Sequence, residues 1–206
     1  TAPPGAEPAT LERMLDERWS ALEFGAPWFA EHERVRAGAM LARLATWLRE
    51  SRAGLELVAV EKGFRVEIGD AQLSGRVDRL ERDRQGRLVV VDLKTGKSKP
   101  KDTELPANAQ LGAYQLAVEH GAFADDGERS GGAMLVQLAK GTKAAEQRQQ
   151  PLADAEDPGW IAAEVAAIAA KLRGSTFTAT ASAPLCRMCD VKASCPIQPE
   201  GRQVTL

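Results

Sequence analysis

The sequence predicts a mixed α/β domain in which helices flank one central sheet and a cysteine-bearing lobe follows at the C-terminus. Three observations predict it. Hydrophobic residues recur with helical spacing before residue 50, and they alternate with polar residues between residues 57 and 80. The apolar run Leu88–Val91 is typical of a central strand that is buried on both faces. All three cysteines lie between residues 186 and 195.

The elements follow in a definite order. Helices are expected from Thr10 to Leu22 and from Glu33 to Arg49. Three antiparallel strands come next, over residues 57–68, 73–80 and 88–91, with turns at 69–70 and 82–86. A lysine-rich loop then leads to a helix over 108–120, a strand over 132–138, an alanine-rich helix over 160–172 and an irregular tail. We therefore divide the chain into an N-terminal helical segment (1–56), a core (57–175) and a cysteine-bearing tail (176–206).

Composition limits the function classes. The 206 residues are 44% hydrophobic and 27% charged, with a net charge of −2, which indicates a globular domain and excludes a generally basic DNA-coating protein. No segment has the ~20 apolar residues that cross a bilayer, and the N-terminus lacks a secretion signal, so we expect no membrane contact and a cytoplasmic location. Because the chain begins without Met, we expect a piece of a longer polypeptide.

Acidic and basic residues at two predicted strand ends carry the chemistry. Asp92 and Lys94 are two positions apart on one strand, so both side chains project from the same face. If the preceding strand pairs through the 82–86 turn, Asp78 comes beside Asp92. Adjacent carboxylates repel each other, and a divalent cation between them relieves the repulsion. An isolated Asp-x-Lys triplet is more often a surface ion pair than a site, so the surrounding motifs decide.

Those motifs resemble a known family. Gly75-Arg76-Val77-Asp78, then Asp92-Leu93-Lys94-Thr95-Gly96, then Gln110 with Tyr114 resemble the G-x-x-D, D-x-K-T-G and Q-x-x-x-Y pattern of the RecB branch of the PD-(D/E)xK nucleases. The resemblance covers about two thirds of the chain, from Leu57 onward, and includes nuclease domains of AddAB and AdnAB type helicase–nucleases. It implies a restriction-endonuclease-like sheet flanked by helices.

The resemblance also implies a role for each residue. Asp78, Asp92 and the main-chain carbonyl of Leu93 would hold Mg²⁺ or Mn²⁺, and Lys94 would be the catalytic lysine. Glu61 matches the family's upstream acidic position, with a solvated strand residue as the alternative. Gln110 and Tyr114 share one helix face beside the active site.

The cysteines match the family as well. The C-x2-C-x5-C spacing of Cys186, Cys189 and Cys195 resembles that of members with a [4Fe–4S] cluster, which takes four thiolates. The fourth cysteine is absent from this chain, so we expect it upstream. The alternatives are a zinc site, itself incomplete, and three free thiols.

The family's metal-binding histidine also has no counterpart here. Relatives place it in a G-T-x-x-H motif before the first strand. His32 and His120 lack that context, and we expect both to be surface residues.

Basic residues border the predicted site. Lys97 and Lys99 follow the catalytic strand, and Arg76 and Arg79 flank Asp78, so we expect these four to contact DNA phosphates. The sequence thus predicts a metal-dependent exonuclease-type deoxyribonuclease for break resection and recombinational repair, acting on single-stranded DNA. The resemblance implies an upstream helicase domain and a second helicase–nuclease subunit as partners. The alternatives are a catalytically silent DNA-binding or subunit-docking module and a zinc or redox module.

Overall fold

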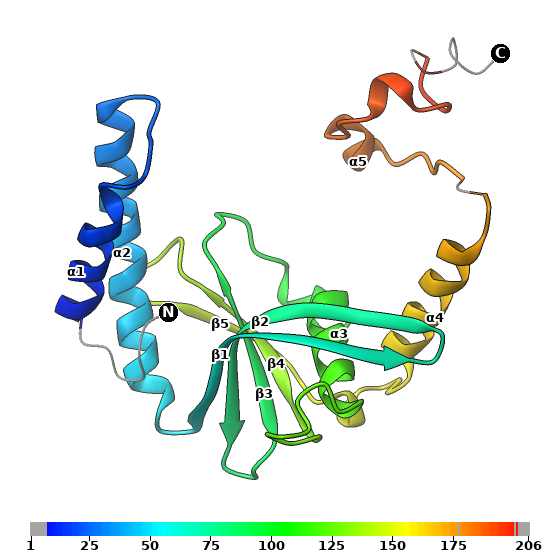
Figure 1. Ribbon diagram of the computed structural model, residues 1–206, viewed down its shortest axis with the longest axis horizontal. Coiled ribbons are helices and arrows are strands. Elements are labelled where there is room, and N and C mark those ends of the chain that lie inside the picture. The colour runs from blue at the N-terminus through cyan, green and yellow to red at the C-terminus, as the bar shows by residue number, and fades with distance from the viewer. Residues whose placement is uncertain (1–7, 177, 200, 202–206) are drawn as a thin grey trace. The chain divides into compact units, whose positions relative to one another are not determined.

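The computed structural model describes residues 8–176, 178–199 and 201. The chain forms two compact units, Thr1–Val165 and Ala166–Leu206. The first unit contains the central sheet together with the two N-terminal helices (Figure 1). The division at residues 56 and 175 stays a prediction from sequence organisation.

The sheet has five strands and is mixed. These are β1 (Leu55–Ile68), β2 (Ala71–Asp83), β3 (Leu88–Lys94), β4 (Ser130–Gln137) and β5 (Ala145–Gln149), in that spatial order. All neighbours are antiparallel except β3 and β4, which run parallel. Gly69 turns the β1–β2 hairpin with a φ of 58°, a value that glycine adopts without strain. The α/β fold with a mixed sheet is therefore confirmed.

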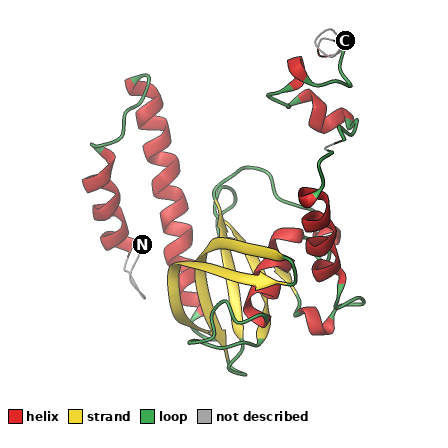
Figure 2. Cartoon of the chain, turned by 45° about the vertical axis from the view of Figure 1, so that its right-hand side comes forward, coloured by secondary structure: helices red, strands yellow, loops and turns green. Residues whose placement is uncertain are grey.

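Helices cover both faces of this sheet (Figure 2). The parallel β3–β4 pair requires a crossover, which contains helix α3 (Ala109–Glu119). Asn108 caps α3, since its side chain accepts a hydrogen bond of 3.0 Å from the Leu111 N–H. On one face the core includes Leu111, Val118 and strand residues such as Val90. On the other face Trp47 and Leu48 of helix α2 (Pro27–Ser51) pack against the sheet, and helix α1 (Pro8–Trp19) packs against α2.

The alternation of side chains along β3 positions the site. Leu88 and Val90 belong to the core under α3, whereas Val89 and Val91 belong to the core under α2. Asp92 continues the first series, so its side chain projects on the α3 side of the sheet. The carboxylate consequently lies on the face that carries Gln110 and Tyr114, at the end where β3 leaves the sheet.

Helix α2 and strand β5 differ from the sequence prediction. Helix α2 begins at Pro27 rather than near Glu33, because proline suits the first turn of a helix. Strand β5 was not predicted, since it contains no apolar run. Its inward residues are Gln147 and Gln149, each only 4% exposed, and their amides replace the apolar side chains that signal a strand.

Shorter elements complete the described chain. The 3₁₀ turns η1 (Asp102–Glu104) and η2 (Leu152–Asp154) precede helix α4 (Trp160–Arg173), whose first residues belong to the first unit. The second unit contains helix α5 (Ala183–Arg187) and the turn η3 (Lys192–Ser194) where the sequence indicated an irregular tail. None of the described helices combines the length and apolarity that a bilayer crossing demands.

Glycines in two helices have different surroundings, which predicts opposite effects when each is replaced by alanine. A Cβ on Gly112 would lie 2.7 Å from the Trp160 ring, so Gly112→Ala is expected to destabilise the protein by about 1–3 kcal/mol. A Cβ on Gly38 in α2 meets only the flexible end of Arg34, so Gly38→Ala is expected to stabilise by about 0.5–1 kcal/mol. Urea denaturation measures both, and equal signs would contradict the packing described.

Candidate active site

Two carboxylates from neighbouring strands meet at one end of the sheet. The β2–β3 ladder ends at the pair Arg79 and Val91, which places Asp78 and Asp92 at the next step. Asp78 Oδ2 accepts a hydrogen bond of 2.7 Å from the Leu93 N–H, so this carboxylate is held against the β3 backbone. The negative charge of Asp78 is close enough to raise the pKa of Asp92.

Asp92 is the buried member of the pair. Its side chain is 8% exposed, and burial, more than any other cause, raises its pKa above the ordinary aspartate value. Lys94 Nζ lies 2.7 Å from Asp92 Oδ2 and opposes that shift. Apart from this ion pair, Oδ2 has no partner among the described residues. A buried carboxylate oxygen of this kind suits a cation ligand.

Gln110 connects the lysine to the carboxylate. Lys94 Nζ donates a hydrogen bond of 3.0 Å to Gln110 Oε1, and Gln110 Nε2 donates one of 3.1 Å to Asp92 Oδ1. Gln110 Nε2 also lies 3.2 Å from the Tyr114 hydroxyl oxygen, to which it donates. Burial raises the pKa of Tyr114, and the charges of Asp92 and Asp78 raise it as well. The two α3 residues therefore fix the orientation of the β3 residues.

The Leu93 backbone faces β2. Lys94 O accepts a hydrogen bond of 2.8 Å from the Leu138 N–H, so the main chain of Lys94 faces β4. Leu93, one residue earlier, faces the other way and donates to Asp78. The N–H and C=O of one strand residue point to the same side, so the Leu93 carbonyl also points toward the β2 side of the site. Two carboxylates and one carbonyl are the oxygen ligands that Mg²⁺ and Mn²⁺ accept, with water completing the shell.

Glu61 is not gathered into this group. The pairs that flank it place Glu61 opposite Asp78, and its backbone has a φ of 49°. Its side chain is 52% exposed and lies 3.9 Å from Arg76, which is itself 68% exposed. Among the described residues, no three acidic, histidine or cysteine side chains come together as a metal-binding group.

Arg79 requires a correction. The side chain was expected to contact DNA, but it is 5% exposed and forms an ion pair of 2.9 Å with the fully buried Glu81. Glu81 also accepts a hydrogen bond of 2.8 Å from Arg52 at the end of α2. Strand alternation turns Arg79 to the face opposite that of Asp78. Its role is structural, because the guanidinium is committed to Glu81 and covered by the fold.

The other predicted positions lie at the surface. Lys97 and Lys99 are exposed on the loop that follows β3, and both face solvent as DNA-contacting residues must. His32 is 68% exposed with Glu33 as its neighbour, and His120 is exposed at the end of α3.

Several residues that hold the site together carried no sequence signal. Arg36 Nη2 of α2 donates a hydrogen bond of 2.7 Å to Thr95 O, immediately after Lys94. Gln149 Nε2 donates to Leu105 O at 2.7 Å and to Asn108 O at 3.2 Å, which ties the start of α3 to β5. Gln115 Nε2 in turn donates to Gln149 Oε1 at 2.8 Å. The alternation of Gln147 and Gln149 was the one pattern that could have indicated an inward polar edge strand.

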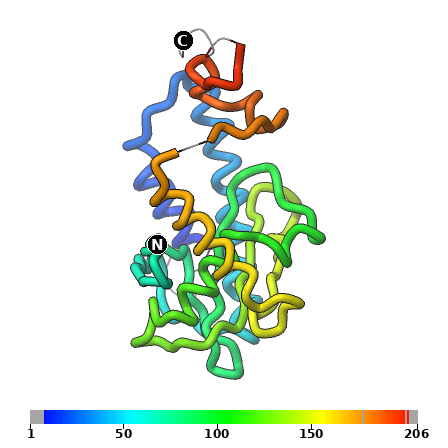
Figure 3. The backbone as a smooth tube through the Cα atoms, turned by 90° about the vertical axis from the view of Figure 1, so that its right-hand side faces the viewer, coloured from blue at the N-terminus to red at the C-terminus, as the bar shows by residue number. Residues whose placement is uncertain are grey.

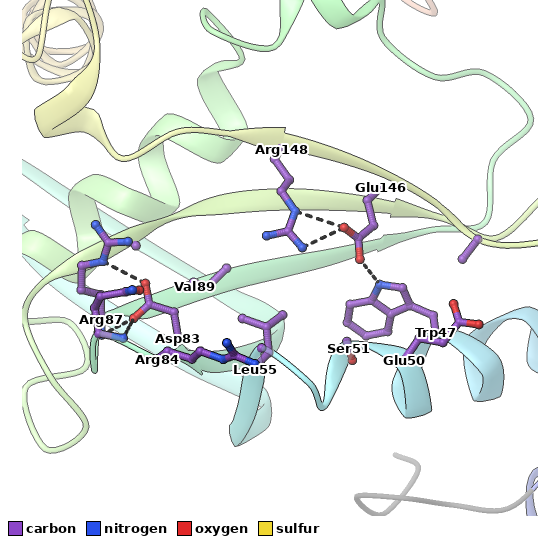
Figure 4. A pocket seen from close by; sticks show the side chains of 14 residues that line it. Trp47, Glu50, Ser51, Leu55, Asp83, Arg84, Arg87, Val89, Glu146 and Arg148 are labelled. Carbon is purple, nitrogen blue, oxygen red and sulfur yellow. Dashed lines mark hydrogen bonds and ion pairs between the residues drawn. The ribbon is translucent and has the colours of Figure 1, made fainter.

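A depression lies on the α2 face of the sheet, and several of the charged side chains that line it form ion pairs (Figure 4). Trp47 Nε1 donates a hydrogen bond of 2.7 Å to Glu146, which also pairs with Arg148 at 2.8 Å. Asp83 pairs with Arg87 at 2.8 Å. These charged groups are therefore paired with one another across the depression.

The cysteines lie in the second unit as free thiols. Cys189 is exposed, whereas Cys186 and Cys195 are partly buried. The three do not assemble into a metal-binding group within the described residues, and a [4Fe–4S] cluster takes four thiolates. The residues present therefore do not by themselves fit such a cluster.

Comparison with known proteins assigns the family. Residues 1–196 match the sequence profile of the PD-(D/E)XK nuclease superfamily. The chain belongs to this superfamily. No curated protein matches the chain. A solved structure titled "Crystal structure of SSO0001" is 18% identical, with a TM-score of 0.45, over 93% of this chain and 81% of that one. That likeness is too distant to bear on function. Members of this superfamily are generally nucleases, and they usually use divalent metal ions.

The buried ion pair predicts unequal effects for the two arginines beside Asp78. Arg79→Ala leaves the buried Glu81 with only Arg52, so it is expected to lower the free energy of unfolding by about 3 kcal/mol. Arg76→Ala removes an exposed side chain and is expected to change it by less than about 0.5 kcal/mol. Urea denaturation of both variants distinguishes them, and a stable Arg79→Ala protein would refute the structural role.

Proposed function

We propose that this chain is the nuclease domain of a bacterial helicase–nuclease of RecB, AddAB or AdnAB type. It hydrolyses phosphodiester bonds of single-stranded DNA in an exonuclease mode, during the resection of double-strand breaks. The observation that carries the proposal is the meeting of Asp78, Asp92 and Lys94, with one Asp92 oxygen buried and contacted only by the lysine among the described residues. The family membership supports nuclease chemistry, and the Gln110–Tyr114 pairing with the catalytic strand supports the RecB branch.

Each residue of the candidate site has a separate role in the proposed reaction. A divalent cation held by Asp78, Asp92 and the Leu93 carbonyl would supply an activated water and stabilise the leaving oxygen. Lys94 has three N–H donors and is fixed by contacts with Asp92 and Gln110, so it can direct a further N–H at the attacked phosphate. Gln110 holds the Asp92 carboxylate and the Lys94 ammonium group in fixed positions, and the Tyr114 hydroxyl accepts a hydrogen bond from Gln110. The chain thereby positions the phosphate and stabilises the charge that develops on it.

A catalytically silent DNA-binding or docking module is the second candidate. It would have no need of a lysine held between Gln110 and a buried carboxylate that faces a second carboxylate, Asp78. The contact geometry thus favours an enzyme over a silent module.

The proposed partners follow from the same resemblance. The domain would receive single-stranded DNA from a helicase domain in the same polypeptide, within a complex that includes a second helicase–nuclease subunit. Free thiols suit a reducing cytoplasm, where we place the protein.

Substitutions at Asp92 and Lys94 test the nuclease proposal. With Mn²⁺ and labelled single-stranded DNA, Asp92→Asn is expected to lower the cleavage rate by at least about 10³-fold, and Lys94→Ala by about 10²–10³-fold. Chelation should stop wild-type cleavage, and added Mn²⁺ should restore it. The control is Asp125→Asn at an exposed position, which should cut normally.

Stability measurements separate a lost ligand from a damaged fold. Burial and the Asp78 charge both disfavour ionised Asp92, so Asp92→Asn is expected to unfold at the same or a higher temperature than wild type without metal. An Asp92→Asn protein that cleaves single-stranded DNA as fast as wild type would refute the nuclease proposal. DNA binding without any metal-dependent cutting by the wild-type chain would favour the silent module.

The cysteines have their own test. We propose that they supply three ligands of a [4Fe–4S] cluster whose fourth thiolate lies outside residues 1–206. Reconstitution of this chain with iron and sulfide is expected to yield little cluster, and a longer chain with the upstream cysteine should yield four irons per protein. Zinc, rather than iron, retained by the longer chain would contradict this assignment.

A further inference from the structure

A lysine-lined pocket opens beside the candidate active site, between two loops. Figure 3 traces the backbone of both loops, the one after β3 and the one between β4 and β5. One loop follows β3 and contributes Lys97 and Lys99. The other joins β4 to β5 and contributes Lys140 and Lys143. The cavity has a volume of about 300 Å³, and its floor includes Gln137, the last residue of β4. We call it the lysine pocket.

The charged residues that line the lysine pocket are all positive. Its four lysines are exposed, and none of its lining residues is acidic. Among the described residues, an ion pair joins its Lys143 to Glu50 at 3.2 Å, between side chains that are 70% and 54% exposed. An exposed pair of this kind contributes little and exchanges readily. The pocket is therefore suited to an anion.

The floor holds a buried donor that the fold does not satisfy. Gln137 is 7% exposed, and its Nε2 has no hydrogen-bond partner among the described residues. An amide N–H buried without an acceptor is costly, and native proteins seldom retain one without a reason. A ligand oxygen that reaches Nε2 would supply the missing acceptor.

The floor is also continuous with the catalytic strand. Gln137 pairs with Lys94 across the parallel β3–β4 ladder, and its side chain lies on the same face of the sheet. Adjacent strands are about 4.8 Å apart, so an anion in the pocket would lie close to one held by Lys94.

The walls of the pocket are held by one helix. Arg36 and Arg43 are seven residues apart on α2, about two turns, and so lie on one side of it. Arg36 donates to Thr95 O at 2.7 Å, at the base of the first loop. Arg43 donates to Leu138 O at 2.6 Å and to Gly141 O at 3.0 Å, in the second loop. These hydrogen bonds thus fix the distance between the two loops.

A further contact fixes the first loop beyond its lysines. Gln147 Nε2 of β5 donates to Pro100 O at 3.0 Å and to Asp102 Oδ1 at 2.6 Å. Lys97 and Lys99 consequently lie on a segment fastened at both ends, by Arg36 before them and Gln147 after them. A lysine loop of purely solvating function would need neither attachment.

We propose that the lysine pocket binds a backbone phosphate of the nucleic-acid strand, next to the phosphate that is cut. This inference rests on the proposed nuclease function and adds a subsite to it. Lys140, Lys143 and the Gln137 amide are binding residues, and Arg36 and Arg43 are positioning residues that hold the loops. The subsite fixes which linkage of the strand reaches Lys94.

Salt dependence of binding tests the proposal without relying on cleavage. Fluorescence anisotropy with labelled single-stranded DNA, in chelator, compares the whole wild-type chain with a Lys140→Ala/Lys143→Ala variant. Loss of two phosphate contacts is expected to lower the slope of log K against log salt by about 1.4, since each contact contributes about 0.7 for single strands. The matched control is Lys171→Ala/Lys192→Ala, which removes two exposed lysines of the second unit and should keep the wild-type slope.

The outcomes separate the two proposals. If the wild type binds and cuts DNA but the pocket variant keeps the full slope, the subsite is refuted and the nuclease assignment stands. If the wild type neither binds nor cuts DNA, both fail. A reduced slope in the pocket variant alone supports the subsite.

Gln137→Met distinguishes a binding role from a structural one. Methionine has a similar shape without the buried donor, so the variant is expected to melt at a higher temperature than wild type while binding DNA several-fold more weakly. A purely structural glutamine would change the melting temperature alone. Unchanged DNA affinity would therefore overturn the role of Gln137.

A neutral linkage identifies the source of the phosphate. DNA with one methylphosphonate beside the cut linkage should bind wild type more weakly, and Lys140→Ala/Lys143→Ala should not respond to the same change. If no neutral linkage affects wild-type binding, while inorganic phosphate raises its melting temperature, the pocket holds a free anion and the strand contact is refuted.

Discussion

The candidate site depends on a repulsion that the fold maintains. Asp78 and Asp92 come from strands that pair through a tight turn, and the ladder brings their carboxylates together whether or not a counter-charge is present. Burial makes the arrangement more costly for Asp92, and Lys94 compensates only in part, since the pKa of Asp92 remains raised. The surrounding sheet, with apolar residues on both faces of β3, provides the rigidity that keeps the charges in place.

The parallel step between β3 and β4 determines what surrounds those charges. Because the two strands run in the same direction, both end at the same end of the sheet, and a loop follows each of them there. The first exit carries the lysines after Asp92, and the second carries Lys140 and Lys143. The crossover also returns α3 over the catalytic strand, so that Gln110 reaches Asp92. The parallel pairing of β3 and β4 thus brings the acidic, basic and amide groups to one end of the sheet.

Sequence patterns predicted the parts of this arrangement that depend on apolar periodicity and local motifs. The Leu88–Val91 run identified the central strand, and the Gly69 turn identified the first hairpin. Strand β5 escaped prediction because its inward residues are Gln147 and Gln149, whose burial is satisfied by amide hydrogen bonds made to distant loops. Arg79 was assigned to DNA because it flanks Asp78 in the sequence. Strand alternation places it on the opposite face, beside Glu81, and the burial of that face depends on distant parts of the chain such as the end of α2.

The two arginines of α2 have a mechanical consequence. A helix of 25 residues behaves as a stiff rod, and Arg36 and Arg43 fasten it to both loops at fixed points along its length. The same helix packs on the sheet through Trp47 and Leu48, so both loops are held at a fixed place relative to the strands that carry the two carboxylates.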